Sequence, residues 1–116
     1  MSASFERPQP PYYAVIITSL LTGEDRAEYE KMDRRMAELG VRQPGYLGRE
    51  GMSDGLGRDL TVIYYADDES IRAWKADLEH LDAQRLGKTR WYECYTVEVA
   101  RVERAYGFSR AAMTSR

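Results

Sequence analysis

The chain has 116 residues, of which 43% are hydrophobic and 31% charged, the balance of one globular domain. A formal net charge of −2 excludes the strongly basic surface of a nucleic-acid-binding protein. No apolar run approaches the about 20 residues that a membrane-spanning helix needs. The first residues show no apolar core before a cleavage site. We therefore expect a cytoplasmic protein with neither a nucleic acid nor a membrane as partner.

Cys94 is the only cysteine and His80 the only histidine of the chain. One cysteine excludes an internal disulfide, and one of each is too few for a structural zinc site. No dinucleotide fingerprint and no phosphate-binding loop occur in the sequence. We therefore expect no metal and no cofactor. Cys94 itself is predicted to be a small buried hydrophobic residue.

The first half of the chain predicts an arm, a strand and a helix. Residues 1–11 hold three of the four prolines and predict a flexible N-terminal arm. The segment from Tyr12 to Ser19 is rich in β-branched and aromatic residues and has apolar residues on both faces, which predicts a central strand. Glu24 to Leu39 predicts a helix that ends before Gly40. Its apolar stripe consists of Tyr29, Met32, Met36 and Leu39.

The second half predicts a hairpin, a helix and a long strand. Tyr46 to Met52 and Asp59 to Ala66 read as strands joined by a loop with two glycines. Acidic and capping residues from Asp67 onward predict the start of a helix that ends at Gly87. Trp91 to Tyr106 alternates as one final strand, whose sixteen residues exceed the usual five or six.

This order is β-α-β-β-α-β, a ferredoxin-like α+β fold with a four-stranded antiparallel sheet and two helices on one face. The other face carries apolar side chains that no further helix can bury, and part of the long last strand lacks a partner in the same chain. If the sheets of two copies pack face to face, the apolar face is buried and the long last strand finds a partner, so we predict a homodimer. Residues 12–107 form the domain, and residues 108–116 a flexible tail.

The last third of the chain carries a family resemblance. Its residues are Ala73-Trp74, Glu79-His80, Gln84, Gly87, Trp91-Tyr92, Tyr95, Val99 and Arg104 to Gly107. They resemble the antibiotic biosynthesis monooxygenase domain family of the dimeric α+β barrel superfamily. In element order the likeness runs from Tyr12 to Gly107. The resemblance implies a pocket in each subunit between helices and sheet, with Trp74 close to it.

For function, the resemblance implies a cofactor-independent monooxygenase that oxidises an aromatic or quinol-like small molecule with dioxygen. Two alternatives remain open: a non-catalytic dimer that only binds a small apolar or aromatic ligand, and a carbonyl isomerase of the same superfamily. Haem-degrading relatives use an asparagine in the pocket, and this chain contains none. Haem degradation is therefore the weaker alternative.

Trp74 and His80 are the candidate catalytic residues. Trp74 is expected to border the pocket, although its place on the apolar stripe with Ile71, Leu78 and Leu81 equally fits an ordinary core residue. His80 is the candidate general base, because an imidazole can accept a proton in the physiological pH range. It equally fits a histidine that interacts with the C-terminal end of its helix.

The candidate substrate-binding residues are Tyr13, Tyr65, Arg90 and Trp91. Neighbouring residues on a strand face opposite ways, so only one of Tyr64 and Tyr65, and one of Trp91 and Tyr92, can line the same pocket. The sequence favours Tyr65 and leaves the second pair open. Arg90 could hold an anionic oxygen or be a solvated strand end. Arg49 is expected to pair with its neighbour Glu50 at the surface.

Overall fold

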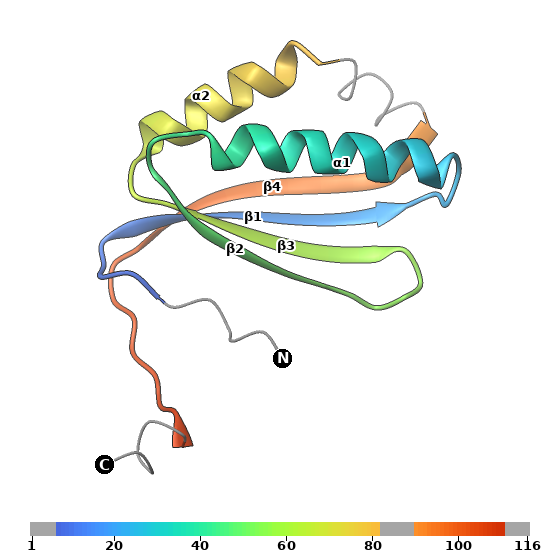
Figure 1. Cartoon of the computed structure of the whole chain (residues 1–116). Helices are drawn as coiled ribbons and strands as arrows, with labels where there is room; N and C mark the ends of the chain where they lie inside the picture. The colour runs from blue at the N-terminus through green and yellow to red at the C-terminus, as the bar shows by residue number, and fades with distance from the viewer. Residues whose placement is uncertain (1–6, 82–89, 111–116) are drawn as a thin grey trace.

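The computed structural model describes residues 7–81 and 90–110 of the chain. Its four strands form one antiparallel sheet in the order β2-β3-β1-β4, and both helices cover the same face of that sheet (Figure 1). This βαββαβ arrangement confirms the predicted ferredoxin-like α+β fold. The elements are β1 (Tyr12–Leu21), α1 (Arg26–Val41), β2 (Tyr46–Ser53), β3 (Arg58–Tyr65), α2 (Asp68–Glu79) and β4 (Tyr92–Val102).

Strand β1 lies between two neighbours, which explains why its sequence is apolar on both faces. Val15, 2% exposed, is paired with Ile63 on β3 and with Val99 on β4. On the helix side, Val15 and Ile63 form the main core with Tyr65, Ile71 and Trp74. The core therefore sits between the middle of the sheet and α2.

Helix α2 begins as the sequence predicts. Asp67 is the N-cap, and its side chain accepts a 2.7 Å hydrogen bond from the backbone N–H of Ser70. The Ser70 hydroxyl accepts a 2.9 Å bond from the backbone N–H of Gly45, in the loop before β2. This pair of bonds fixes the start of α2 against the start of β2.

Helix α2 ends at Glu79, earlier than predicted. The backbone N–H groups of His80 and Leu81 bond to the carbonyls of Asp77 and Leu78, three residues back. Such bonds tighten and close the last turn of a helix. The predicted end at Gly87 lies outside the described residues, because residues 82–89 are not among them.

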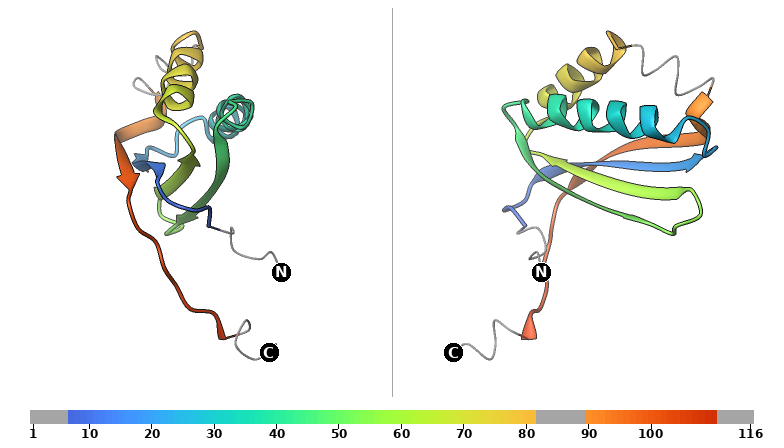
Figure 2. Two further views of the ribbon diagram at one scale, coloured as in Figure 1. Left: turned by 90° about the vertical axis from the view of Figure 1, so that its left-hand side faces the viewer. Right: turned by 45° about the vertical axis from the view of Figure 1, so that its right-hand side comes forward.

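Strand β4 is shorter than predicted, with eleven residues instead of sixteen. It pairs with β1 of the same chain up to Val102, which lies opposite Tyr12. Before Tyr12 come Pro10 and Pro11, which have no N–H to donate, so the ladder cannot continue on that side. The segment after Val102 instead runs away from the sheet (Figures 1 and 2).

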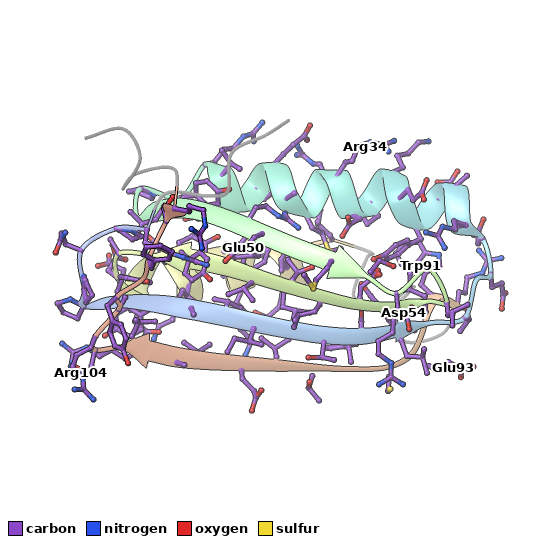
Figure 3. All side chains as sticks on the ribbon, turned by 90° about the horizontal axis from the view of Figure 1, so that it is seen from below. Arg34, Glu50, Asp54, Trp91, Glu93 and Arg104 are labelled. Carbon is purple, nitrogen blue, oxygen red and sulfur yellow. The ribbon has the colours of Figure 1, made fainter. Side chains whose placement is uncertain are left out.

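The face of the sheet opposite the helices carries a second apolar cluster. Tyr12, Ala14 and Tyr64 are buried there, with Ile16, Leu47, Val62 and Val102 packed around them. Figure 3 shows this face, with Glu50 of β2 labelled on it. Arg7 pairs with Glu50 and lies over the ring of Tyr64 at 5.0 Å, so one residue of the arm rests on this face.

Cys94 is exposed, which makes the prediction of a buried cysteine wrong. It lies on β4, the edge strand, and faces away from the helices, where the described chain supplies nothing to cover it. In the part of the chain that the structure describes, neither helix is long and apolar enough to cross a membrane.

Candidate active site: a cleft between the helices and the sheet

A cleft of about 190 Å³ lies between the two helices and the helix-facing side of the sheet. All six elements contribute side chains to it. Helix α1 gives Tyr29, Asp33, Met36 and Ala37; α2 gives Trp74 and Leu78; the strands give Ile17, Ser19, Arg49, Asp59, Thr61, Ile63, Tyr92, Tyr95 and Val97. Its walls are therefore mainly aromatic and aliphatic, with three charged residues among them.

Helical spacing explains the contribution of α1. Position 33 follows position 29 by four residues, and positions 36 and 37 follow position 33 by three and four, so these side chains lie on one face of the helix. That face is turned to the sheet, whereas Arg34 projects from the opposite side (Figure 3). Asp33 is thus a carboxylate within an otherwise apolar face.

A β-bulge in β4 brings Tyr92 into the cleft. Leu20 pairs with Cys94 but Leu21 pairs with Tyr92, so Glu93 is an extra residue on β4. Without the bulge, strict alternation would place Tyr92 on the opposite face from Tyr95. With it, both tyrosines line the cleft, and their rings meet edge to face at 5.2 Å between centroids.

Trp74 forms the inner wall of the cleft. It is 7% exposed, and its indole Nε1–H donates a 3.0 Å hydrogen bond to the backbone carbonyl of Met36 on α1. Its ring lies 6.2 Å from that of Tyr65. Trp74 is therefore both a core residue and a pocket residue, so the two interpretations of its sequence position are compatible.

The cleft carries three charged side chains from three elements: Asp33 of α1, Arg49 of β2 and Asp59 of β3. Burial raises the pKa of the Asp33 carboxyl; the positive charge of Arg49 opposes this rise, and the negative charge of Asp59 adds to it. Among the described residues, none of the three takes part in an ion pair.

Two tyrosines next to these charges are held in the neutral form. The rings of Tyr29 and Tyr92 meet edge to face at 5.8 Å. Burial is the main reason that the pKa of each phenol lies above its usual value. Both hydroxyls therefore keep their protons at neutral pH, and the pair, whose side chains also interact with each other, can offer a hydrogen-bond donor to a ligand.

His80 and Arg90 lie away from the cleft lining. His80 is the exposed C-cap of α2. Arg90 pairs with Asp25 at 3.0 Å, and its backbone carbonyl accepts a 2.6 Å bond from the hydroxyl of Thr22. Arg90 thus ties the start of β4 to the loop before α1.

The three predicted aromatic binding residues also lie outside the cleft lining, although close to it. Tyr65 is fully buried, and its hydroxyl donates a 3.2 Å bond to the carbonyl of Gly40; burial raises its pKa to about 12. Tyr13 packs at the edge of the same core. Trp91 is buried against Tyr29 and borders a separate void of about 10 Å³. Tyr92, and not Trp91, faces the cleft.

Sequence reasoning missed Asp33 and Arg49. The predicted pair of Arg49 with Glu50 is wrong, because the two alternate on β2: Arg49 faces the cleft, and Glu50 accepts a 2.8 Å bond from Tyr64 on the other face. Alternation along β2 was the available signal for Arg49. For Asp33, the signal was its position four residues after Tyr29 and three before Met36, within the apolar stripe.

No protein-family model matches the chain. The uncharacterized protein YqjZ of Bacillus subtilis (strain 168) is 41% identical over 97 residues, which cover 84% of each chain. Identity at this level over most of both chains indicates common descent.

Solved structures extend the comparison to the fold. A variant of SnoaB, a cofactor-independent oxygenase from Streptomyces nogalater, superposes with a TM-score of 0.67 at 15% identity, covering 83% of this chain and 97% of that one. An antibiotic biosynthesis monooxygenase superposes with a TM-score of 0.63 at 16% identity, covering 76% and 95%. The chain belongs to the family that includes YqjZ of Bacillus subtilis, and its fold is that of the antibiotic biosynthesis monooxygenase domains.

Proposed function

We propose that this protein is a cofactor-independent monooxygenase that oxidises a small phenolic or quinol-like aromatic compound in the cleft. The observation that carries the proposal is the cleft itself: an aromatic and aliphatic pocket bordered by Trp74, with charged groups and neutral phenols in its lining. SnoaB, a cofactor-independent oxygenase, has the same fold. Fold alone does not fix activity, so the proposal depends on the side chains in the cleft.

The size of the cleft favours a small substrate. Sites for drug-sized ligands typically enclose about 300–1,000 Å³, and this cleft has about 190 Å³. We therefore infer a compound of two or three fused rings in preference to a four-ring one. Flat rings also suit walls that Tyr92, Tyr95 and Trp74 supply, because aromatic rings pack well edge to face and in offset stacks.

The proposed reaction draws its electrons from the substrate. Loss of a proton from a phenol or from a ring CH₂ gives an electron-rich anion that can pass an electron to dioxygen. One oxygen atom then enters the ring carbon and the other leaves as water, so that a CH₂ group and O₂ become C=O and H₂O. The protein's part is to favour the anion electrostatically and to shield the reacting pair from solvent.

Oxygen uptake tests this proposal. Anthrone and 1,8-dihydroxynaphthalene are suitable probes, with three and two rings, and a protein-free reaction measures the uncatalysed uptake of each. We expect uptake above the uncatalysed rate that falls on Trp74→Phe, because the cleft wall changes shape. Tight binding of both probes without uptake would instead identify a ligand-binding protein. Proton exchange at the anthrone CH₂ without uptake would identify an isomerase-like activity.

We also infer that the protein works as a homodimer. Tyr106 and Phe108 are 98% and 70% exposed on the segment that runs away from the sheet. Val97 and Val99, on the edge strand β4, are about half exposed, at 52% and 49%. Large apolar side chains exposed together on an edge strand and an extended segment are unusual for a monomer. A second copy would cover them.

A further inference from the structure

We propose that Asp33 takes the proton from the substrate in the cleft and that Arg49 receives the oxyanion that results. This inference rests on the proposed function, since it names the proton acceptor of the same reaction. It also replaces His80 as the expected base, because His80 is exposed at the end of α2 and does not line the cleft.

The position of Asp33 supports the proposal. It projects from α1 into the cleft one turn after Tyr29 and one turn before Met36. The groups that face it across the cleft are Arg49 from β2, Asp59 from β3 and Tyr92 from β4. On its own helix, Tyr29 lines the cleft one turn away, and the charges of Glu30 and Arg34 act on Asp33 from outside the cleft. The cleft side chains of α2 are Trp74 and Leu78, which carry no charge. A carboxylate here therefore meets a ligand in a partly apolar environment.

Arg49 supports the second half of the proposal. It is the only cation among the side chains that line the cleft in the described chain. No ion pair among the described residues engages its guanidinium, so its N–H groups remain available to an anionic oxygen. A charge-assisted hydrogen bond from arginine to an oxyanion is about twice as strong as a neutral one.

The two half-buried tyrosines of the cleft are less suited to accept a proton than Asp33. Tyr29 and Tyr92 stay protonated at neutral pH, because burial raises the pKa of both, and so act as donors. Burial also raises the pKa of Asp33, which makes its carboxylate a stronger base than an exposed aspartate. Asp59 contributes to the same rise through its negative charge.

The proton balance is simple. The substrate O–H or C–H bond breaks, its electron pair stays on the substrate as a phenolate or enolate, and the proton forms an O–H bond on the Asp33 carboxylate. The negative charge thus moves from Asp33 to the substrate oxygen beside Arg49. When dioxygen is reduced, the proton on Asp33 is available to the water that leaves.

Anaerobic proton exchange isolates this step from oxygen chemistry. The probe is anthrone in D₂O, and the readout is loss of its CH₂ signal by NMR with wild type, Asp33→Asn, Asp33→Glu and Glu38→Gln. A general base contributes about 10²–10⁴-fold. We expect Asp33→Asn to lose at least 100-fold of the acceleration, Asp33→Glu to restore part of it, and Glu38→Gln, an exposed acid on the same helix, to match wild type.

A second readout reports on the oxyanion and does not require turnover. The probe is alizarin, a hydroxyanthraquinone whose phenol and phenolate differ in colour and which cannot be oxygenated at a CH₂ group. We expect bound alizarin to ionise at lower pH than free alizarin. Arg49→Gln should move that midpoint upward, and Asp33→Asn should move it downward, because the two substitutions remove charges of opposite sign.

The outcomes separate this inference from the proposed function. Oxygen uptake that survives in Asp33→Asn overturns the inference and leaves the proposed function standing. Exchange and opposite alizarin shifts without oxygen uptake support the inference while the oxygenase proposal fails. Three further results overturn the inference. The first is exchange that is lost in His80→Ala but kept in Asp33→Asn. The others are alizarin midpoints that neither Arg49→Gln nor Asp33→Asn moves, and the absence of binding of either probe.

Discussion

The indole Nε1–H of Trp74 donates a 3.0 Å hydrogen bond to the backbone carbonyl of Met36. This bond joins α2 to α1 at the point where both helices line the cleft. The carbonyl of a helical residue normally bonds to an N–H four residues later, so the indole is an additional donor to the same oxygen. Trp74 thereby sets the distance between the two helical walls of the cleft.

Replacing Trp74 tests this connection. Trp74→Phe removes the bond and leaves a small cavity, and we expect it to lower the free energy of unfolding by about 1–3 kcal/mol. Trp91→Phe is the matched control. Trp91 is equally buried, but its Nε1–H has no hydrogen-bond partner among the described residues, so its loss removes no bond. Urea denaturation in which Trp91→Phe costs as much as Trp74→Phe would contradict the role of the bond.

Gly40 is expected to resist substitution because of its neighbours. A Cβ at this position would lie 3.0 Å from the Tyr65 hydroxyl oxygen and 3.3 Å from the Trp74 indole nitrogen. Gly→Ala inside a helix usually gains about 1 kcal/mol. We expect Gly40→Ala to gain nothing or to destabilise, as measured by thermal unfolding.

Tyr65→Phe provides the control for Gly40. It removes the hydroxyl that the new Cβ would meet, at a cost of about 1 kcal/mol for the lost bond to the Gly40 carbonyl. Gly40→Ala should therefore be less costly in a Tyr65→Phe background than alone. Strict additivity of the two substitutions would show that the close approach is harmless.

Asp33 gives a pH dependence whose sign follows from its burial. Burial raises its pKa in the folded state above the unfolded value of about 3.9. Between the two pKa values the folded state binds more protons, so this group's contribution to stability falls as pH rises through that window. Ionised Asp33 therefore destabilises the fold at neutral pH.

Asp33→Asn should consequently stabilise the protein at pH 7, by no more than about 1 kcal/mol because solvent screens a half-buried group. The gain should shrink as pH falls and disappear below about pH 3. Glu38→Gln, exposed on the same helix, should show no such trend. Thermal melts across this pH range provide the measurement, and a destabilised Asp33→Asn protein at pH 7 would contradict the assignment.

The extended segment after β4 makes a prediction about assembly. If Phe108 packs against a second copy, Phe108→Asp should weaken the dimer by about 2 kcal/mol or more, since interface aromatics often dominate binding energy. Light scattering coupled to size exclusion measures this, with Leu56→Asp as control, because Leu56 is 85% exposed in the β2–β3 loop. A wild-type protein that elutes as a monomer at micromolar concentration would remove the inference.

Most of the fold could be predicted from the sequence, but less of the candidate site. Element order and β1 followed from apolar patterning, because burial on both faces imposes it directly. The lengths of α2 and β4 did not follow. Strand β4 ends at Val102 because the prolines before Tyr12 cannot continue the hydrogen-bond ladder. The residues that limit β4 therefore lie in a distant part of the sequence.

The site depended on features that periodicity cannot show. Tyr92 reaches the cleft only because Glu93 forms a bulge, which shifts the alternation on which the choice between Trp91 and Tyr92 depended. Asp33 of α1 and Arg49 of β2 influence each other electrostatically across the cleft, and the spacing of residues in the sequence does not show that they are close. The helical stripe predicted Trp74 as a core residue, because a buried aromatic on such a stripe is a strong local signal. Its place beside the pocket was implied by the family resemblance and not by the spacing.

The most direct measurement of the central claim is the fate of dioxygen itself. Anthrone is incubated with the protein under ¹⁸O₂, and the anthraquinone formed is analysed by mass spectrometry before the carbonyl oxygen can exchange. The account predicts one ¹⁸O atom per product molecule, at a rate above the protein-free control that falls in Trp74→Phe. Product formed only at the protein-free rate, or with wild type and Trp74→Phe indistinguishable, would contradict it.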